Sequence, residues 1–184
     1  MKYFISFVFL ILICAGCSSK EDKIKEIWKD LHFVNPSGEQ VKPEFWSQKK
    51  SVLYFGFSHC PDMCPLALTN FGRASLILGE KAKNFQFVFI SLDPERDSPS
   101  TLKNYIQMFP GKQLTAVSPD LETMNHLINL FGLVRKKSND TEKYMIDHSN
   151  FIYVLDKDLS SLGNFPGGTS ANVLATKLRE MEIP

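Results

Sequence analysis

The stretch SVLYFGFSHCPDMCP, residues 51–65, decides the fold class of this 184-residue chain. Its first half, residues 51–57, is short, apolar and rich in β-formers, which is typical of a strand buried on both faces. Two cysteines follow, Cys60 and Cys64, and a helical spacing of apolar residues starts at about Pro65. The stretch therefore predicts a central strand that turns into a helix, with both cysteines at the turn.

The rest of the chain alternates strands and helices around this unit. Further strand patterns fall at residues 85–92, 115–117, 151–156 and 159–163, and helical stripes at 102–109, 121–131 and 174–181. Residues 31–41 predict a small N-terminal hairpin with a Pro/Gly turn, whereas residues 134–145 are polar and predict an irregular loop. Asp93 and Asp97 are expected to cap the helix that follows them and to brace the loop before it. This order predicts an α/β fold with a central mixed β-sheet flanked by helices.

The N-terminus has the pattern of an export signal. A positive Met1-Lys2 precedes an apolar run over residues 4–13, which is too short for a comfortable membrane span, and Ala15-Gly16 leads into Cys17. The ending resembles a bacterial lipobox, although Cys14 stands where a leucine is usual. A plain cleaved signal and an uncleaved anchor are the alternatives. The predicted division is a lipoprotein signal peptide over 1–16, lipidated Cys17 with a tether over 17–30, and a folded domain over 31–184.

Composition narrows the function classes. The chain is 43% apolar and 22% charged with a formal net charge of +1, which suits one globular domain and gives no basic field for nucleic acid. After loss of the signal and lipidation of Cys17, only Cys60 and Cys64 remain as free thiols in an oxidising compartment. A close pair of this kind forms either a disulfide or a soft-metal site. The loop between them is too small for a disulfide to stabilise much.

The chemistry of the two cysteines points to a metal. A helix N-terminus favours a thiolate over a thiol, and the i, i+4 spacing predicts both sulfurs on one helix face. His148, just before the strand at residues 151–156, is the best-placed third ligand. Two thiolates and one imidazole form a soft set that favours Cu(I) and can also hold Cu(II). An inert disulfide and an ordinary hydrogen-bonded His148 are the alternatives.

Four motifs in order resemble the Sco/SenC family of copper proteins. They are Phe55–Pro65 (FGFSHCPDMCP), Ile90–Asp97 (ISLDPERD), Phe131–Leu133 (FGL) and Asp147–Ser149 (DHS). The likeness extends from about Phe33 to the last helix. It implies a thioredoxin-like fold tethered in the bacterial cell envelope and facing the periplasm, with the choice between inner and outer membrane left open.

The resemblance also implies a role and a ligand set. Relatives help to mature the dinuclear copper centre of cytochrome c oxidase, so the expected partner is the oxidase copper-site subunit or another periplasmic copper protein. The implied copper ligands are Cys60, Cys64 and His148. Asp147 is expected to orient the imidazole. Asp62 is expected to stabilise the helix N-terminus electrostatically or to tune the access of copper to the site.

Two other activities, thiol–disulfide reduction and peroxide reduction, also use reactive cysteines. Some relatives act as thiol–disulfide reductants, which makes the cysteines a catalytic redox pair and leaves open whether the protein is an enzyme. A thiol peroxidase needs threonine three residues before its cysteine, where this chain has Phe57.

His59 is expected to face solvent, His32 and His126 to be surface residues, and Met63 to serve in packing rather than as a thioether ligand.

Overall fold

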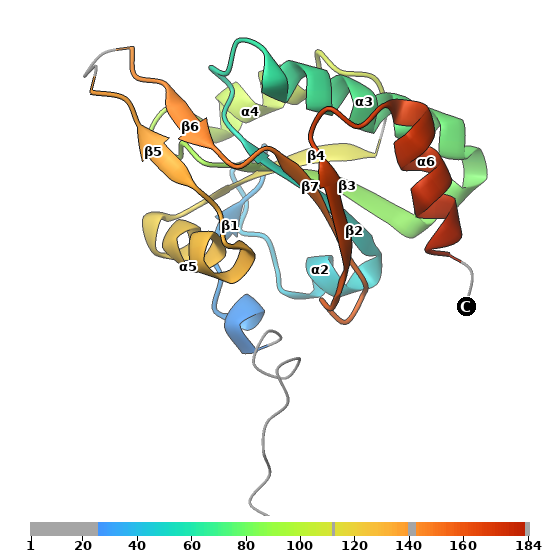
Figure 1. Ribbon diagram of the computed structural model, residues 1–184. Coiled ribbons are helices and arrows are strands. Elements are labelled where there is room, and N and C mark those ends of the chain that lie inside the picture. Colours follow the sequence, from blue (N-terminus) through green and yellow to red (C-terminus); the bar gives the residue numbers. More distant parts are fainter. Residues whose placement is uncertain (1–25, 112, 140–142, 183–184) are drawn as a thin grey trace, which may run out of the picture.

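The computed structural model describes residues 26–111, 113–139 and 143–182. The predicted signal peptide, Cys17 and most of the predicted tether lie outside these residues. A six-stranded sheet runs in the order β1-β4-β3-β2-β7-β8 (Figure 1). The bounds are β1 Phe33–Val34, β2 Lys50–Gly56, β3 Phe85–Ser91, β4 Leu114–Pro119, β7 Phe151–Leu155 and β8 Ser161–Pro166. Strands β2, β3 and β4 are parallel, while β1, β7 and β8 run antiparallel to their neighbours, so the sheet is mixed as predicted.

Helices cover both faces of the sheet. Their bounds are α2 Glu44–Gln48, α3 Met63–Leu78, α4 Pro99–Ile106, α5 Leu121–Phe131 and α6 Ala171–Glu180, with a 3-10 helix η1 at Gly79–Asn84. Helices α3, α4 and α6 pack on one face and α2 and α5 on the other (Figure 1). The arrangement is the thioredoxin-like α/β fold that the sequence predicted.

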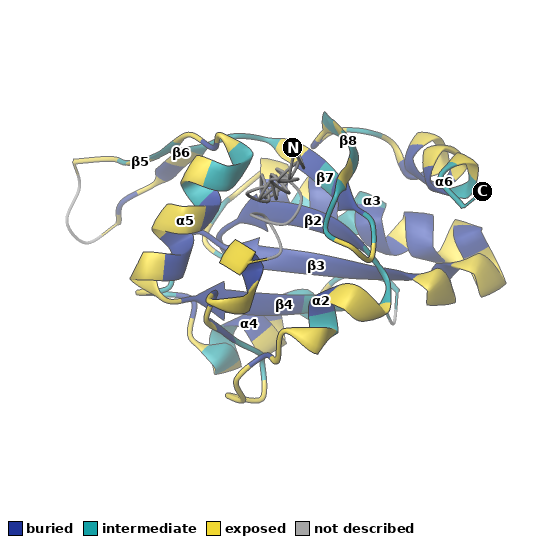
Figure 2. Cartoon of the chain, turned by 90° about the horizontal axis from the view of Figure 1, so that it is seen from below, coloured by how far each residue is buried: buried dark blue, intermediate teal, exposed yellow. Residues whose placement is uncertain are grey.

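Strand β2 is buried on both faces. Val52 and Tyr54 pack toward α3 and α6, while Leu53 and Phe55 pack toward α5 and the N-terminal aromatic residues. Each of the four side chains is fully buried, and such burial stabilises a fold by roughly 1.5–3 kcal/mol per large apolar side chain. Figure 2 shows β2 and β3 as the buried interior of the molecule. The cysteine turn therefore begins from one of the most firmly held segments of the chain.

The folded body begins before residue 31. Residues 26–29 are helical, and Trp28 is buried with its ring centroid 4.8 Å from that of Trp46 and 6.2 Å from that of Phe33. Part of the segment expected to be tether thus closes one face of the core. The expected hairpin beside it is small: Val34 makes a single antiparallel bridge with Gln40, and β1 pairs mainly with β4.

The segment expected to be an irregular loop, residues 134–145, contributes one strand of a second sheet. Strands β5 (Arg135–Lys137) and β6 (Ile146–His148) form an antiparallel pair in which Arg135 lies opposite His148. The prediction of a loop was wrong because β5 is entirely cationic and lacks alternating apolar residues. The pair stands to one side of the main sheet (Figure 1).

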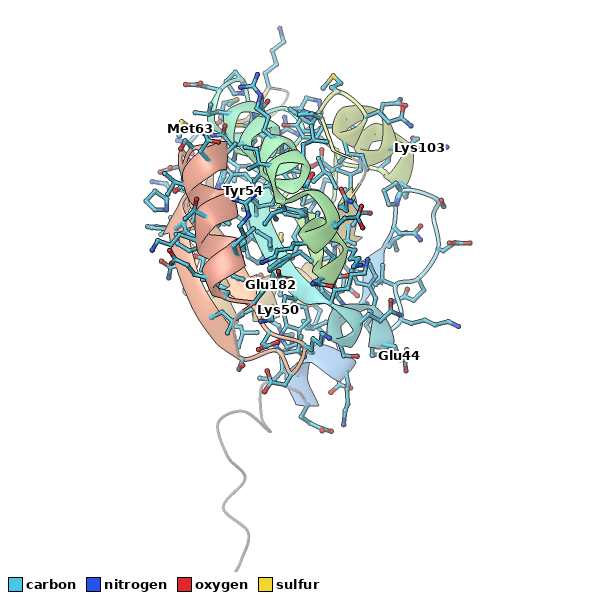
Figure 3. All side chains as sticks on the ribbon, turned by 90° about the vertical axis from the view of Figure 1, so that its right-hand side faces the viewer. Glu44, Lys50, Tyr54, Met63, Lys103 and Glu182 are labelled. Carbon is cyan, nitrogen blue, oxygen red and sulfur yellow. The ribbon has the colours of Figure 1, made fainter. Side chains whose placement is uncertain are left out.

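The start of α4 differs from expectation. Ser98, not Asp93 or Asp97, caps α4, because its hydroxyl accepts a hydrogen bond from the Thr101 amide at 3.2 Å. At the other end of the molecule, the Lys50 ammonium donates to the carbonyl of Met181 just after α6. Figure 3 shows Lys50 and Glu182 at the end opposite Met63, with Tyr54 between them. No helix within the described part of the chain combines the length and apolar composition needed to cross a membrane.

Candidate metal centre

The two cysteines lie between β2 and the first turn of α3. The Cys60 amide donates to the carbonyl of Phe57 at 3.2 Å, which closes a turn, and α3 begins only at Met63. Cys60 therefore lies in the loop ahead of the helix and Cys64 in its first turn, rather than both on one helix face as expected. Cys60 is half-buried and Cys64 is buried.

His148 reaches the cysteines from the end of β6. Its Nε2 lies 3.6 Å from Cys64 Sγ, and its Nδ1 lies 2.9 Å from the carbonyl oxygen of Ser149. Because a carbonyl can only accept, Nδ1 carries the proton in the neutral ring and Nε2 presents its lone pair toward Cys64. The rings of Phe57 and Tyr54 contact the imidazole edge-on, with centroid distances of 5.9 and 6.4 Å. The ring is thus held in the orientation that a metal ligand needs.

Three donor atoms converge at this point. The two sulfurs and a ring nitrogen of His148 all lie within 4.8 Å of one another, and they form the one such group of three His, Cys, Asp or Glu side chains found across the described residues. Two sulfurs and one imidazole nitrogen form a soft, three-donor set. The set fits a monovalent soft ion better than zinc, which takes a fourth ligand.

The two thiols differ strongly in acidity. The pKa of Cys60 is lowered, first by a hydrogen bond from the Cys64 side chain and also by the backbone amides of Asp62 and Cys64. The pKa of Cys64 is raised, first because its thiol proton is held in a hydrogen bond to Cys60, and also because the side chain is buried and a thiolate at Cys60 opposes a second negative charge. In the metal-free reduced protein, Cys60 is therefore the thiolate and Cys64 the thiol.

A buried hydroxyl that sequence reasoning missed lies beneath the cysteines. The Tyr54 hydroxyl donates to Asn150 Oδ1 at 2.9 Å and lies 3.9 Å from Cys64 Sγ. Burial, first, and the neighbouring cysteines raise the pKa of Tyr54 well above its usual range, so it stays a neutral donor. Tyr54 joins the floor of the site to the segment that follows His148.

The expected supporting acids lie elsewhere. Asp147 is exposed and alternates away from His148 along β6, so the Ser149 carbonyl takes the orienting role expected of Asp147. Asp62 is the residue before α3 and makes no side-chain capping bond, although its backbone amide supports Cys60. Met63 is 36% exposed rather than packed.

The remaining histidines lie outside the group. His59 is half-exposed and its Nδ1 lies 3.0 Å from the Ser58 hydroxyl. His32 and His126 are exposed, as expected of surface residues.

Comparison with known proteins agrees with this geometry. The chain matches the SCO1/SenC family over residues 19–182. The SCO2-like protein of Rickettsia prowazekii is 36% identical over 140 residues, which is 75% of this chain and 68% of that protein. Copper-bound ScoI of Bradyrhizobium japonicum superposes with a TM-score of 0.73 at 30% identity, covering 82% of this chain and 96% of that one. Yeast Sco1 superposes with a TM-score of 0.73 at 26% identity, covering 83% and 94%.

Fold and site together define a class of protein. A thioredoxin-like sheet presents two cysteines at a strand-to-helix turn and one histidine from a separate hairpin, which is a dithiol–imidazole site on a redox-type fold. With the match over residues 19–182, the chain belongs to the SCO1/SenC family.

Proposed function

We propose that this protein binds one copper ion through Cys60 Sγ, Cys64 Sγ and His148 Nε2. The observation that carries the proposal is the convergence of these three donors within 4.8 Å. Two observations favour copper over harder metal ions. The donors are soft, and ScoI of Bradyrhizobium japonicum, a similar structure, has copper bound.

The acidities of the donors indicate how copper enters. Cys60 is already a thiolate and half-exposed, so it is the first ligand that an incoming ion meets. Cys64 is buried and holds its proton, which copper must displace. Binding therefore releases about one proton near neutral pH.

We further propose that the bound copper is cargo for the dinuclear copper centre of cytochrome c oxidase. Membership of the SCO1/SenC family supports this role. A half-exposed Cys60 beside a buried Cys64 lets acceptor thiolates replace the ligands stepwise, beginning at Cys60. The acceptor is the oxidase copper-site subunit or another periplasmic copper protein.

The proposed place of action is the bacterial cell envelope, with the domain held to a membrane through lipid on Cys17. The proposal rests on the Ala-Gly-Cys pattern at residues 15–17. The short segment from Cys17 to residue 26 can span at most roughly 30 Å. Membrane fractionation of the full chain tests the anchor: Cys17→Ser should leave the membrane fraction, and its retention at the wild-type level would refute lipidation at Cys17.

Copper stoichiometry and Cu(I) affinity of the full-length reduced protein test the site. Wild type should hold one copper, and Cys60→Ser, Cys64→Ser and His148→Ala should each weaken binding strongly. His59→Ala is the matched control, since His59 is next to Cys60 but outside the donor group. An unchanged affinity in His148→Ala would refute the three-ligand site.

A second function is favoured by the unequal thiols. The Cys60 thiolate can attack a partner disulfide to form a mixed disulfide, with one partner sulfur leaving as thiolate. Cys64 then loses its proton to that sulfur and attacks Cys60 Sγ, which frees the second partner thiol and leaves a Cys60–Cys64 disulfide. This reduction needs both cysteines but not His148. A His148→Ala variant that supports oxidase assembly at the wild-type level would favour the reductant over the copper carrier.

A further inference from the structure

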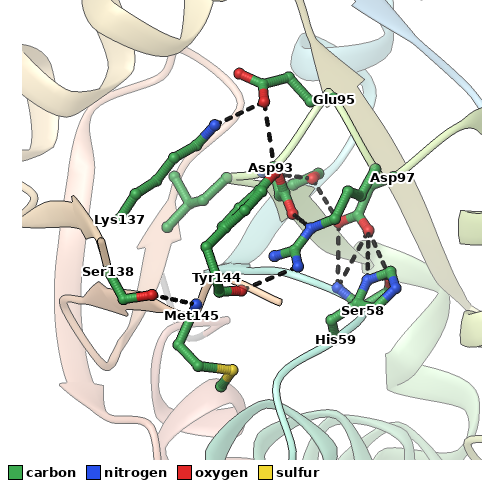
Figure 4. A network of polar contacts seen from close by, with 12 residues as sticks. Ser58, His59, Asp93, Glu95, Asp97, Lys137, Ser138, Tyr144 and Met145 are labelled. Atoms are coloured by element: carbon green, nitrogen blue, oxygen red, sulfur yellow. Dashed lines mark hydrogen bonds and ion pairs between the residues drawn. The ribbon is translucent and has the colours of Figure 1, made fainter. Parts of the chain in front are cut away.

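The loop between β3 and α4 contacts two segments that lead to the donors, one before Cys60 and one before His148. Asp93 and Asp97 in this loop are completely buried, which is costly for carboxylates unless they are hydrogen-bonded. Figure 4 shows that the two side chains have different partners: Asp97 faces Ser58 and His59, whereas Asp93 lies beside Tyr144. Neither residue belongs to the donor group.

Asp97 fixes the segment that leads to the cysteines. Its carboxylate accepts from the Ser58 amide at 3.1 Å, from the Ser58 hydroxyl at 2.5 Å and from the Ser91 hydroxyl at 2.6 Å. Ser58 lies two residues before Cys60, so these bonds fix the start of the cysteine turn to the end of β3.

Asp93 fixes the segment that leads to His148. One oxygen accepts from the Tyr144 hydroxyl at 2.5 Å and the other from Arg96 Nε at 2.5 Å. Arg96 also donates to the Tyr144 carbonyl at 2.9 Å, and its guanidinium carbon lies 3.5 Å from the Tyr144 ring centroid. Tyr144 stands two residues before β6, the strand that ends at His148. Its hydroxyl is therefore locked into the loop that also fixes the cysteine turn.

Two further contacts join β5 to the same loop. Arg135 Nε donates to the Leu92 carbonyl at 2.7 Å, and Lys137 forms an ion pair with Glu95 at 2.7 Å. The Lys137–Glu95 pair is partly exposed, and exposed ion pairs contribute little. Among these contacts, the hydroxyl–carboxylate bond of Tyr144 to Asp93 is the one that is buried at both ends.

We propose that Tyr144 is a positioning residue for His148, and that its hydrogen bond to Asp93 sets the distance between the imidazole and the two cysteines. The proposal rests on the proposed copper site and extends it to residues outside the donor group. Strands β5 and β6 are three residues each and pair only with each other, so they have little rigidity of their own. Their placement depends on the loop between β3 and α4.

Copper affinity tests the proposal through a double-mutant cycle. Tyr144→Phe in the full-length protein removes the hydroxyl and keeps the ring that stacks on Arg96. Its Cu(I) affinity should fall about 10- to 100-fold, as for other residues that orient a metal-ligating histidine. In a His148→Ala background the same change should cost nothing further, because the imidazole it positions is absent. An unchanged affinity in the single variant, or the same fall in both backgrounds, would overturn the proposal.

Amide hydrogen exchange on the copper-free protein gives a second readout that does not need metal. Tyr144→Phe should speed exchange of the β5 and β6 amides at least tenfold while leaving β2 and β3 unchanged. Unchanged exchange in the hairpin would overturn the proposal even if the protein bound no copper, so its failure is separable from failure of the copper site. Tyr105→Phe is the matched control, since the buried Tyr105 hydroxyl has no hydrogen-bond partner among the residues that the structure describes.

Discussion

The sulfur of Cys64 lies against the α-carbon of Gly56, so that a Cβ atom at position 56 would come within 2.6 Å of Cys64 Sγ. The same atom would also lie 2.9 Å from the Phe89 ring. Because glycine has no side chain, position 56 at the end of β2 leaves the space that the Cys64 side chain occupies. The central strand therefore packs directly against one of the three donors.

Gly56→Ala should displace Cys64 and destabilise the fold. Overpacking of a core position costs about 1–3 kcal/mol, and the shifted sulfur should also lower copper affinity. Gly168→Ala is the control, because no atom lies within 4 Å of its added Cβ. Denaturant unfolding and copper titration of both variants check the prediction, and a Gly56→Ala protein as stable as wild type would contradict it.

Tyr54→Phe should destabilise the protein by about 1–3 kcal/mol, since it leaves the Asn150 side-chain oxygen without its 2.9 Å donor. Tyr105→Phe should be nearly neutral because no hydrogen bond is lost there. If urea unfolding gives the same loss of unfolding free energy for both variants, the bond to Asn150 contributes nothing to stability.

Alkylation of the reduced, copper-free protein should separate the two thiols by pH. Hydrogen bonds to Cys60, the Cys64 thiol first, lower the pKa of Cys60 to about 3. A lowered pKa means that the reactive thiolate persists as the pH falls, so Cys60 should react with iodoacetamide at an almost constant rate from neutral pH down to about pH 4. Cys64, with its raised pKa, should stay unmodified over that range.

Peptide mass spectrometry assigns the label, and the urea-unfolded chain is the control. In that control both cysteines should react only as the pH approaches the ordinary thiol pKa of about 8.5. A Cys60 rate that falls tenfold for each pH unit below 8 in the folded protein would show an unperturbed thiol.

Ser98→Ala should cost about 1 kcal/mol of stability, because its hydroxyl accepts the Thr101 amide at the start of α4. Ser170 also precedes a helix but makes no side-chain capping bond, so Ser170→Ala should change stability by only a few tenths of a kcal/mol. A comparison of the two midpoints in urea decides whether the hydrogen bond, rather than serine itself, stabilises the helix.

The centre of the main sheet was predictable because β2 and β3 are buried on both faces. Strand β3 carries the unbroken apolar run Phe87–Ile90, and all seven of its residues are buried. Such runs, separated by helical stripes, leave few alternatives to a layered α/β fold. The three donors followed from their place at strand ends and from the family resemblance, and the structure brings all three together.

The surroundings of the donors were not predictable, because they depend on contacts distant in sequence. Tyr54 meets Asn150 only because β2 pairs with β7 in a register that sets Tyr54 opposite Ile152. The hairpin of β5 and β6 is held by buried polar bonds such as Tyr144 to Asp93, which leave no apolar periodicity in the sequence. Asp147 looked suited to orient His148, but strand alternation turns it to solvent.

The unequal burial of the two cysteines also bears on how the site withstands oxidation. A partly exposed thiolate such as Cys60 is the first group that peroxide converts to sulfenic acid, and further oxidation to sulfinic acid is irreversible. Cys64 Sγ lies within 4.8 Å and is shielded from the oxidant, so it can condense with the sulfenic acid and expel water. The resulting disulfide is reducible by other thiols, and the damage remains repairable.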